Sequence, residues 1–215
     1  MPVFGRDKRK TNARYVNTQI VRSGKRKFFL PREKWGKEST PLKEIEMHFG
    51  YSISNFIRKC FARKNALKGS KSPVIVLDWG CGTGKALNDL HKMFGEKVKL
   101  YGFSKDSFPE WVGSKHTAFI QEETNVSPRF FKKGSIDLIY SSLGLGYLLG
   151  QPPLYKLLGK FFSRLSQRGR LIIPRFDRYK FNTLLLSKVM AEAEKNGVTV
   201  RVRKLPNCLI FERRG

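Results

Sequence analysis

An acidic residue and three alternating glycines form the part of this sequence best suited to chemistry. Four apolar residues, 74–77, lead into Asp78, and glycine then stands at positions 80, 82 and 84. The apolar run predicts a buried strand, and the glycines predict a tight turn at the start of a helix. Glycine has no Cβ, so a ligand can come close to the backbone of such a turn. We therefore expect a ligand-binding site at the carboxyl end of this strand.

Two nucleotide-binding loops are excluded by their spacing. A phosphate-binding P-loop needs Lys followed by Ser or Thr after its last glycine, and another glycine five positions before that one. Here Lys85 is followed by Ala86, and Trp79 stands where the earlier glycine should be. The dinucleotide-binding pattern needs a glycine three residues after its second one, and Lys85 occupies that position too. Both departures argue against these two nucleotide-binding functions.

The remaining pattern, an apolar run followed by Asp-x-Gly-x-Gly-x-Gly, resembles the first motif of class I S-adenosylmethionine-dependent methyltransferases. The resemblance covers roughly residues 40–215 and implies S-adenosylmethionine as the cofactor. In that family the glycine loop packs on the methionine part of the cofactor, and an acid near its ammonium group gives a charge-assisted contact. The candidates for cofactor binding at this motif are Asp78, Gly80, Cys81, Gly82, Thr83 and Gly84.

The family usually has an acid at the end of its second strand, where it accepts hydrogen bonds from the ribose hydroxyls. Ser104 stands at that position, and Asp106 is the candidate to compensate for it. A hydroxyl accepts more weakly than a carboxylate, so weakened cofactor binding and a fold that has lost catalysis both stay open. After the third strand, the resemblance assigns Glu123 to the adenine amino group, with Glu122 as the alternative register and Thr124 beside them.

The segment after the fourth expected strand resembles the family's region beside the reacting methyl group. This resemblance implies that Ser141, Ser142 and Leu143 line the cofactor site. The motifs that several methyltransferase classes use on their acceptors are missing there, so we assign no catalytic residue. The candidate substrate-facing residues on the same rim are Tyr147, Arg175 and Asp177.

No metal site is expected from the sequence. The three cysteines are odd in number and far apart, without a Cys-x-x-Cys pair, so neither a zinc site nor a disulfide framework is indicated. His48, His91 and His116 show no metal-ligand spacing. We interpret each of them as a surface or helix residue.

Charge is the compositional outlier of the chain. It has 43 Lys and Arg against 17 Asp and Glu, a formal net charge of +26, while its hydrophobic content of 40% is ordinary for a globular protein. Such an excess favours polyanionic partners, with nucleic acid first and an anionic membrane surface second. A lysine-rich solvated surface without a specific partner is the alternative.

Residues 1–37 look like a basic N-terminal arm, followed by a methyltransferase-like domain over residues 38–215. Few apolar residues separate the cations of the arm, and such segments often become ordered on a polyanion. Aromatic side chains lie among these cations and could stack on bases or anchor the arm to the core. The candidate nucleic-acid-binding residues are Arg6, Lys8, Arg9, Lys10, Arg14, Arg22, Lys25, Arg26 and Lys27.

Hydrophobic periodicity predicts an α/β fold. A helical lead-in at 40–68, with Pro41 at its first helical position, is joined by a linker to a sheet core at 74–215. Alternating strands and helices indicate a doubly wound, mostly parallel sheet, and the last strand of the family's seven-stranded sheet runs antiparallel. We expect strands at 74–77, 98–103, 116–121, 135–140, 170–173, 198–202 and 208–212, and helices at 85–94, 154–165 and 181–196.

The sequence also bounds the compartment. It contains neither an apolar stretch of about 20 residues nor an apolar signal core at its N-terminus. We expect an intracellular and cytoplasmic protein, with mitochondrial and nucleolar locations left open. The oligomeric state is not indicated.

Three functions fit these observations. The first is an S-adenosylmethionine-dependent methyltransferase acting on RNA, either ribosomal or transfer RNA. The second is a catalytically weak or inactive protein of the same fold that binds a ribosome or a ribosome assembly intermediate. The third is a small-molecule or protein methyltransferase, against which the charge excess argues. We favour the first, with the second as its alternative.

Overall fold

The computed structural model describes most of the chain after residue 38. The described residues are 13–16, 19–22, 39–68, 72–104, 106–112, 114–121, 130–142, 144, 154–175 and 183–214, of which 13–16, 19–22, 67–68 and 183–185 are described in backbone only.

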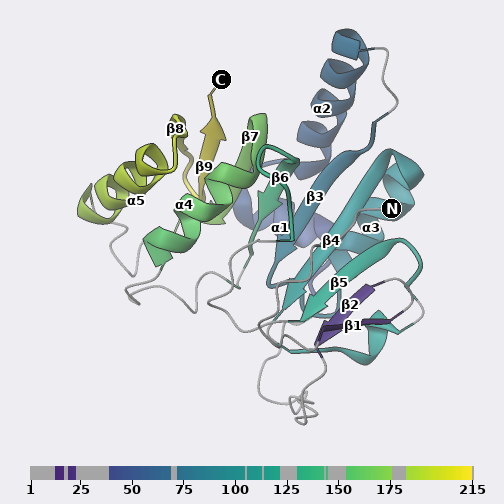
Figure 1. The fold of residues 1–215 in the computed structure, drawn as a ribbon. Helices are drawn as coiled ribbons and strands as arrows, with labels where there is room; N and C mark the ends of the chain where they lie inside the picture. The colour runs from purple at the N-terminus through teal and green to yellow at the C-terminus, as the bar shows by residue number, and fades with distance from the viewer. Residues whose placement is uncertain are drawn as a thin grey trace.

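A seven-stranded sheet forms the centre of the molecule, in the order β5-β4-β3-β6-β7-β9-β8 (Figure 1). The strands from β5 to β7 pair in parallel, and β9 is antiparallel to both of its neighbours. This arrangement confirms the expected α/β fold with a mostly parallel sheet. The strands are β3 (Val74–Trp79), β4 (Val98–Ser104), β5 (Thr117–Gln121), β6 (Ile136–Tyr140), β7 (Leu165–Pro174), β8 (Val200–Lys204) and β9 (Cys208–Arg213).

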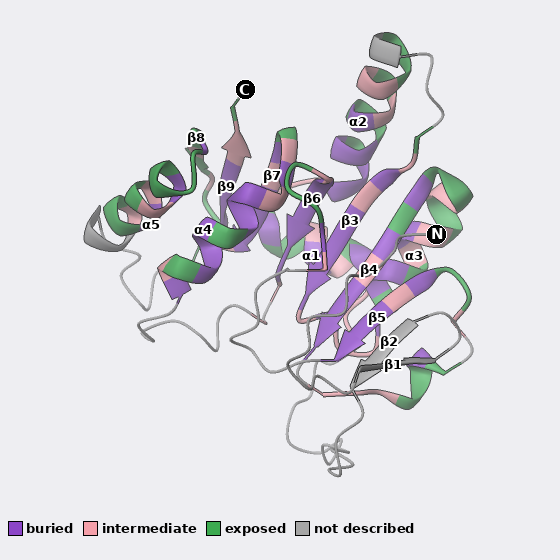
Figure 2. Cartoon of the chain, viewed as in Figure 1, coloured by how far each residue is buried: buried purple, intermediate pink, exposed green. Residues whose placement is uncertain are grey.

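Helices cover both faces of the sheet. Alternate residues of β3 face opposite sides: Val76 packs with α1, α2 and α3, and Leu77 packs with α4 and α5. The central strands are buried on both faces (Figure 2), as continuous apolar strands in a parallel sheet require. The helices are α1 (Leu42–Phe49), α2 (Ile53–Lys68), α3 (Lys85–Phe94), α4 (Leu154–Arg164) and α5 (Thr183–Lys195), with short 3₁₀ turns at η2 (Gly95–Lys97) and η3 (Pro109–Trp111).

The helical lead-in is two helices rather than the single one expected over 40–68. Gly50 has a left-handed backbone with φ of +58° and ends α1 after Phe49, and α2 begins at Ile53. The break follows from this glycine, which stops a helix where another residue would resist positive φ. Pro41 is the N-cap of α1 and not its first helical residue.

Two strands lie within the N-terminal arm, where we expected none. β1 (Ala13–Val16) and β2 (Gln19–Arg22) pair in an antiparallel register, and Figure 1 shows them beside β5. Arg14 lies on β1 and Arg22 on β2. The other candidate cations of the arm lie outside the described residues.

Strand β7 begins five residues earlier than expected, directly after α4. Its pairing with β6 shifts register between Ile136 and Leu138, and Arg168 within this stretch has a φ of +61°. Residues 165–169 are therefore an irregular first half of the strand. The shift leaves Leu138 opposite Arg170, so the regular parallel pairing starts at that arginine.

Arg170 ties the lead-in helices to the sheet. Its guanidinium donates to Glu212 Oε2 through Nε at 2.8 Å and to the Tyr51 hydroxyl through Nη1 at 2.6 Å. It also lies over the ring of Phe56, 4.6 Å from the ring centroid. One side chain thus connects β7 and β9 with the segment between α1 and α2.

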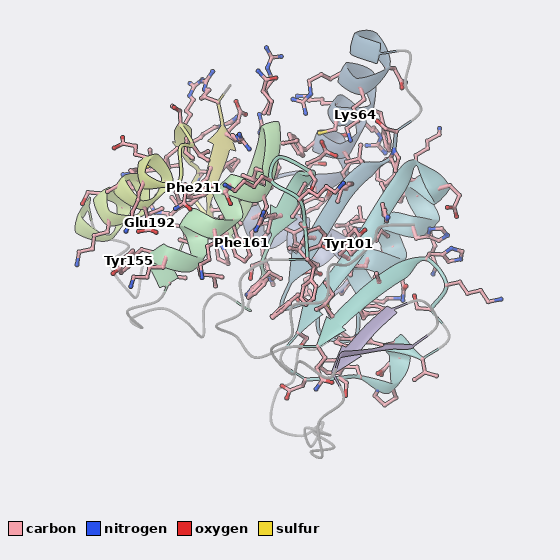
Figure 3. The ribbon with its side chains drawn as sticks, viewed as in Figure 1. Lys64, Tyr101, Tyr155, Phe161, Glu192 and Phe211 are labelled. Carbon is pink, nitrogen blue, oxygen red and sulfur yellow. The ribbon has the colours of Figure 1, made fainter. Side chains whose placement is uncertain are left out.

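Asp137 forms a second connection between the lead-in and the sheet. Its buried carboxylate accepts hydrogen bonds from Lys64 Nζ at 2.6 Å, the Ile75 backbone N–H at 2.8 Å and Ser166 Oγ at 2.9 Å. Figure 3 shows Lys64 on α2, above the sheet. Because α2, β3 and β7 all meet this carboxylate, we infer that it fixes the lead-in relative to β3.

Replacing Asp137 should therefore destabilise the protein. Asp137→Ala should lower the free energy of unfolding by about 2–4 kcal/mol, since it removes the buried carboxylate that accepts from Lys64, the Ile75 N–H and Ser166. Chemical denaturation measures this change. The matched control is Glu194→Ala on the exposed side of α5, which should change stability by less than about 0.5 kcal/mol. Equal effects of the two substitutions would contradict this account.

Candidate functional site

The glycine motif forms a tight loop between β3 and α3. Gly80, Gly82 and Gly84 all have positive φ, at +89°, +52° and +81°. The Gly80 and Cys81 N–H groups both donate to the Phe103 carbonyl of β4, at 2.7 and 3.0 Å. The strand, turn and helix predicted from the sequence are therefore present, and this backbone conformation explains the glycines.

The segment after β6 comes into close contact with this loop. A Cβ on Gly80 would lie 2.5 Å from Gly144 Cα, and a Cβ on Gly144 would lie 2.6 Å from the Trp79 carbonyl oxygen. Real Cβ atoms do not approach backbone this closely, so both positions need glycine. The contact brings the segment after β6, which carries Ser141 and Ser142, to the edge of the glycine loop.

Asp78 is the buried acid at the end of β3. Its residue is 3% exposed, and burial raises the pKa of its carboxyl from 3.8 to about 7. Tyr140 of β6 stands opposite it in register, and the nearby hydroxyl opposes part of this pKa shift. That hydroxyl is itself buried and makes no hydrogen bond of standard geometry. The pair is thus polar, enclosed and incompletely satisfied, as in a site built for a polar ligand.

Two aromatic residues that the sequence analysis did not single out support the loop. Trp111 Nε1 donates to the Gly82 carbonyl at 2.9 Å, and the Trp111 ring stacks on Phe119 with centroids 4.6 Å apart. Phe119 fills the space against Gly84 and Gly102, where a Cβ would lie 2.5 and 2.6 Å from its ring. No local sequence signal marks these contacts, because they join residues that are far apart in the chain.

Ser104 ends β4 beside the glycine loop. It is buried, and its Oγ accepts from the Asp106 backbone N–H at 3.3 Å. The loop after β4 therefore bends back on Ser104 and keeps Asp106, which is half-buried, close to the strand end. Both candidates for the ribose position lie at the carboxyl edge of the sheet next to β3.

The other predicted residues lie after β6, in the glycine loop, after β7 or outside the described residues. Ser141 is buried with its N–H donating to Ile172 at 3.0 Å, whereas Ser142 is half-buried. Burial raises the pKa of the Cys81 thiol, so this side chain packs rather than reacts, while Thr83 is half-buried. Arg175 is exposed after β7. The candidates Glu122, Glu123, Thr124, Leu143, Tyr147 and Asp177 lie outside the described residues.

The fold is shared with solved methyltransferase structures. The methyltransferase in complex with the Trm112 methyltransferase activator of Haloferax volcanii is 12% identical with a TM-score of 0.50, over 85% of this chain and 95% of that one. The CurJ carbon methyltransferase is 12% identical with a TM-score of 0.50, over 87% and 62%. A SAM-dependent methyltransferase from Aquifex aeolicus is 20% identical with a TM-score of 0.49, over 86% and 98%.

The first two of these likenesses, with the strand order and the antiparallel β9, define the fold as that of class I S-adenosylmethionine-dependent methyltransferases. No protein-family profile and no curated protein sequence matches the chain. Among the described residues, no helix combines the length and the apolar character that crossing a membrane requires.

The close approach at Gly80 gives a test of the loop. Gly80→Ala should lower the free energy of unfolding by about 2–4 kcal/mol, because the methyl group meets the Gly144 backbone in addition to resisting positive φ. Gly197→Ala is the matched control, since Gly197 has a φ of +68° but nothing within 4 Å of its Cβ position. This control substitution should lower the free energy of unfolding by only about 1 kcal/mol. Thermal and chemical denaturation compare the two, and equal losses would contradict the close approach.

Proposed function

We propose that this protein is an S-adenosylmethionine-dependent methyltransferase that acts on RNA. The observation that carries the cofactor is the combination of a buried acid with three left-handed glycines at the carboxyl end of β3. In open α/β sheets, ligands bind outside the carboxyl ends of the strands where the strand order reverses. Here the chain order reverses at β3, between β4 and β6.

The residues around the loop suit the parts of this cofactor. Asp78 would receive the ammonium group, because a buried carboxyl with a raised pKa gains most from a neighbouring cation. The glycines allow the methionine part to lie close to the backbone. Ser104 and Asp106 would face the ribose. When bound, S-adenosylmethionine supplies a methyl group on a positively charged sulfur, ready for a nucleophile of the acceptor.

The described residues around the loop would then contribute alignment to methyl transfer rather than proton chemistry. Among the described residues around the loop, Asp78 and Cys81 are both buried, and burial keeps the thiol of Cys81 protonated. Neither is placed to attack an acceptor. Holding an acceptor in line with the methyl group is a sufficient source of rate enhancement.

Charge supports RNA as the acceptor. The net charge of +26 far exceeds what solubility needs, and a strongly basic surface attracts a polyphosphate backbone. Exposed cations also occur on the described surface, where Arg201 and Arg203 alternate along the edge strand β8 and Arg58 and Lys59 lie on α2. The N-terminal arm carries the densest group of cations in the sequence.

A protein that binds RNA without methylating it is the second candidate. The observation that favours it is Ser104, since a hydroxyl already accepting the Asp106 N–H offers the ribose less than the usual carboxylate. In this form the chain would bind a ribosome or an assembly intermediate. A small-molecule or protein acceptor would leave the charge excess without a role.

Methyl transfer to RNA tests the proposal directly. The full-length protein with radiolabelled S-adenosylmethionine should label ribosomal or transfer RNA, and Asp78→Asn should lose most of this activity. RNA binding that persists without any labelling would instead support the second candidate. Labelling of protein or small molecules alone, with no RNA binding, would contradict both.

The salt dependence of RNA binding tests the arm separately. A plot of log affinity against log salt concentration has a negative slope. Each lost contact with a phosphate of single-stranded RNA reduces the magnitude of this slope by about 0.7. Replacing Arg6, Lys8, Arg9 and Lys10 with Gln should therefore reduce the slope by about 3 if each cation contacts one phosphate. The matched control replaces four exposed lysines of α4 and α5, Lys156, Lys160, Lys188 and Lys195, and should leave it nearly unchanged. An equal change of slope in both variants would show that the arm is not the main RNA-binding surface.

A further inference from the structure

Two of the three histidines of the chain meet on the surface at one end of α3. His91 lies in the last turn of α3, and His116 lies directly before β5. Their rings stack with centroids 3.6 Å apart and an angle of 9° between the planes. Their sequence positions are 25 residues apart, so the contact results from the fold and not from a local motif.

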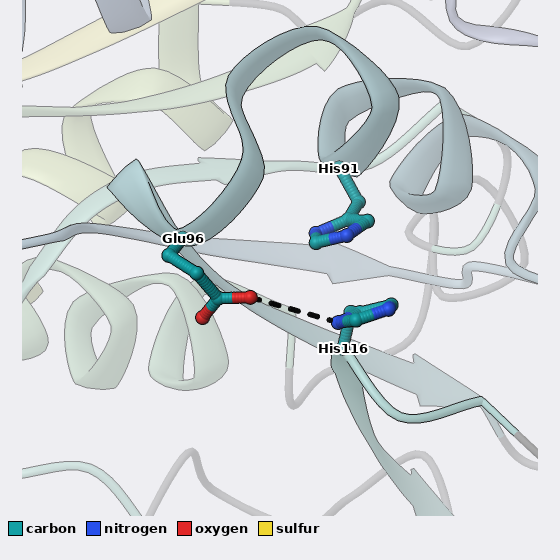
Figure 4. Close-up of side chains that lie close together, drawn as sticks. All are labelled: His91, Glu96 and His116. Atoms are coloured by element: carbon teal, nitrogen blue, oxygen red, sulfur yellow. Dashed lines mark ion pairs between the residues drawn. The ribbon is translucent and has the colours of Figure 1, made fainter.

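A carboxylate completes the group. Glu96 lies in η2, and its Oε1 is 3.7 Å from His116 Nδ1 (Figure 4). One ligand atom from each of the three residues lies within 4.8 Å of the others. Among the described residues, this is the one such group of three potential metal ligands. It occurs in a chain where cations outnumber acids by 43 to 17.

We propose that His91, Glu96 and His116 bind a zinc ion. Two imidazole nitrogens and one carboxylate oxygen are a ligand set that zinc accepts, with water in the fourth position. Ligand atoms of a tetrahedral zinc ion stand about 3.4 Å apart at bond lengths of about 2.1 Å. The ligand atoms lie within 4.8 Å of one another but the two rings are stacked, so closing the site requires one imidazole to turn out of the stack until both nitrogen lone pairs point at the ion. The side chains of Glu96 and His116 are 92% and 49% exposed, so both have room to change rotamer and water reaches the ion.

The surroundings select a nitrogen-binding metal over a hard cation. Lys92 and Lys97 flank the group in the sequence, and Glu96 is its only carboxylate, so simple attraction for Mg²⁺ or Ca²⁺ is weak. Those ions prefer oxygen ligands, whereas imidazole suits zinc. The carbonyl end of α3 adds a favourable partial negative charge beside His91.

The position indicates a structural role. The glycine loop precedes α3 at Lys85, and His91 lies about 9 Å further along the helix axis at 1.5 Å per residue. The metal would therefore lie toward the end of α3 that is away from the glycine loop. It would join the end of α3 and η2 to the start of β5, and so brace the helix that follows the cofactor loop. This inference does not depend on the proposed methyltransferase activity.

Zinc titration of the chelator-treated full-length protein tests the site. Calorimetry should give one zinc per chain, and free zinc at about 100 times the Kd should raise Tm by about 5–10 °C. His91→Ala and His116→Ala should each weaken binding at least about tenfold. Mg²⁺ should give no comparable shift in Tm.

His48→Ala is the matched control. His48 is 48% exposed and lies 3.8 Å from Glu44, so it resembles His116 in exposure and in its acidic neighbour but has no second histidine. This variant should bind zinc as tightly as the natural sequence. Cobalt(II) gives an independent readout, since its visible absorption should appear with the natural sequence and with His48→Ala and disappear with His116→Ala. Absence of zinc binding, equal binding by all the variants, or an equal effect of Mg²⁺ would overturn the proposal.

Discussion

The close packing of backbone around the end of β3 is the constraint on which the rest of the structure depends. Gly80 touches Gly144, Gly84 and Gly102 touch the Phe119 ring, and the Phe103 carbonyl accepts two N–H groups of the loop. No side chain larger than hydrogen fits at these contacts. As a result β4, β5 and the segment after β6 all pack closely against the loop that follows β3. The same convergence encloses Asp78 and raises the pKa of its carboxyl. A buried carboxyl of this kind favours a cationic ligand beside it.

Contacts from the lead-in helices and the C-terminal strands hold β3 in this arrangement. Asp137 joins α2 to β3 and β7, and Arg170 joins the α1–α2 junction to β7 and β9. Both residues lie on the strands that continue the sheet from β3. A carboxylate satisfied by three donors and an arginine with three partners are costly to rearrange, so β3 keeps its place between β4 and β6.

Much of this fold was predictable because its signals are local. Continuous apolar runs marked the buried strands, and the glycine spacing marked the loop whose positive φ values the structure shows. The errors have local causes as well, since Gly50 ends a helix that periodicity alone would continue, and the register shift near Arg168 lengthens β7. The contacts that complete the candidate sites were out of reach. Tyr140 facing Asp78, Trp111 on Gly82 and the pairing of His91 with His116 arise only when distant segments are brought together.

Calorimetric titration with S-adenosylmethionine at pH 6.5, in buffers of different ionisation enthalpy, tests the central claim most directly. Asp78, with a pKa of about 7, is mostly protonated at that pH, and a cation bound beside it should displace most of one proton. We expect one cofactor per chain, proton release with the natural sequence, and weaker binding without that release for Asp78→Asn. Absence of binding at millimolar cofactor, or identical binding and proton release by the variant, would contradict the account.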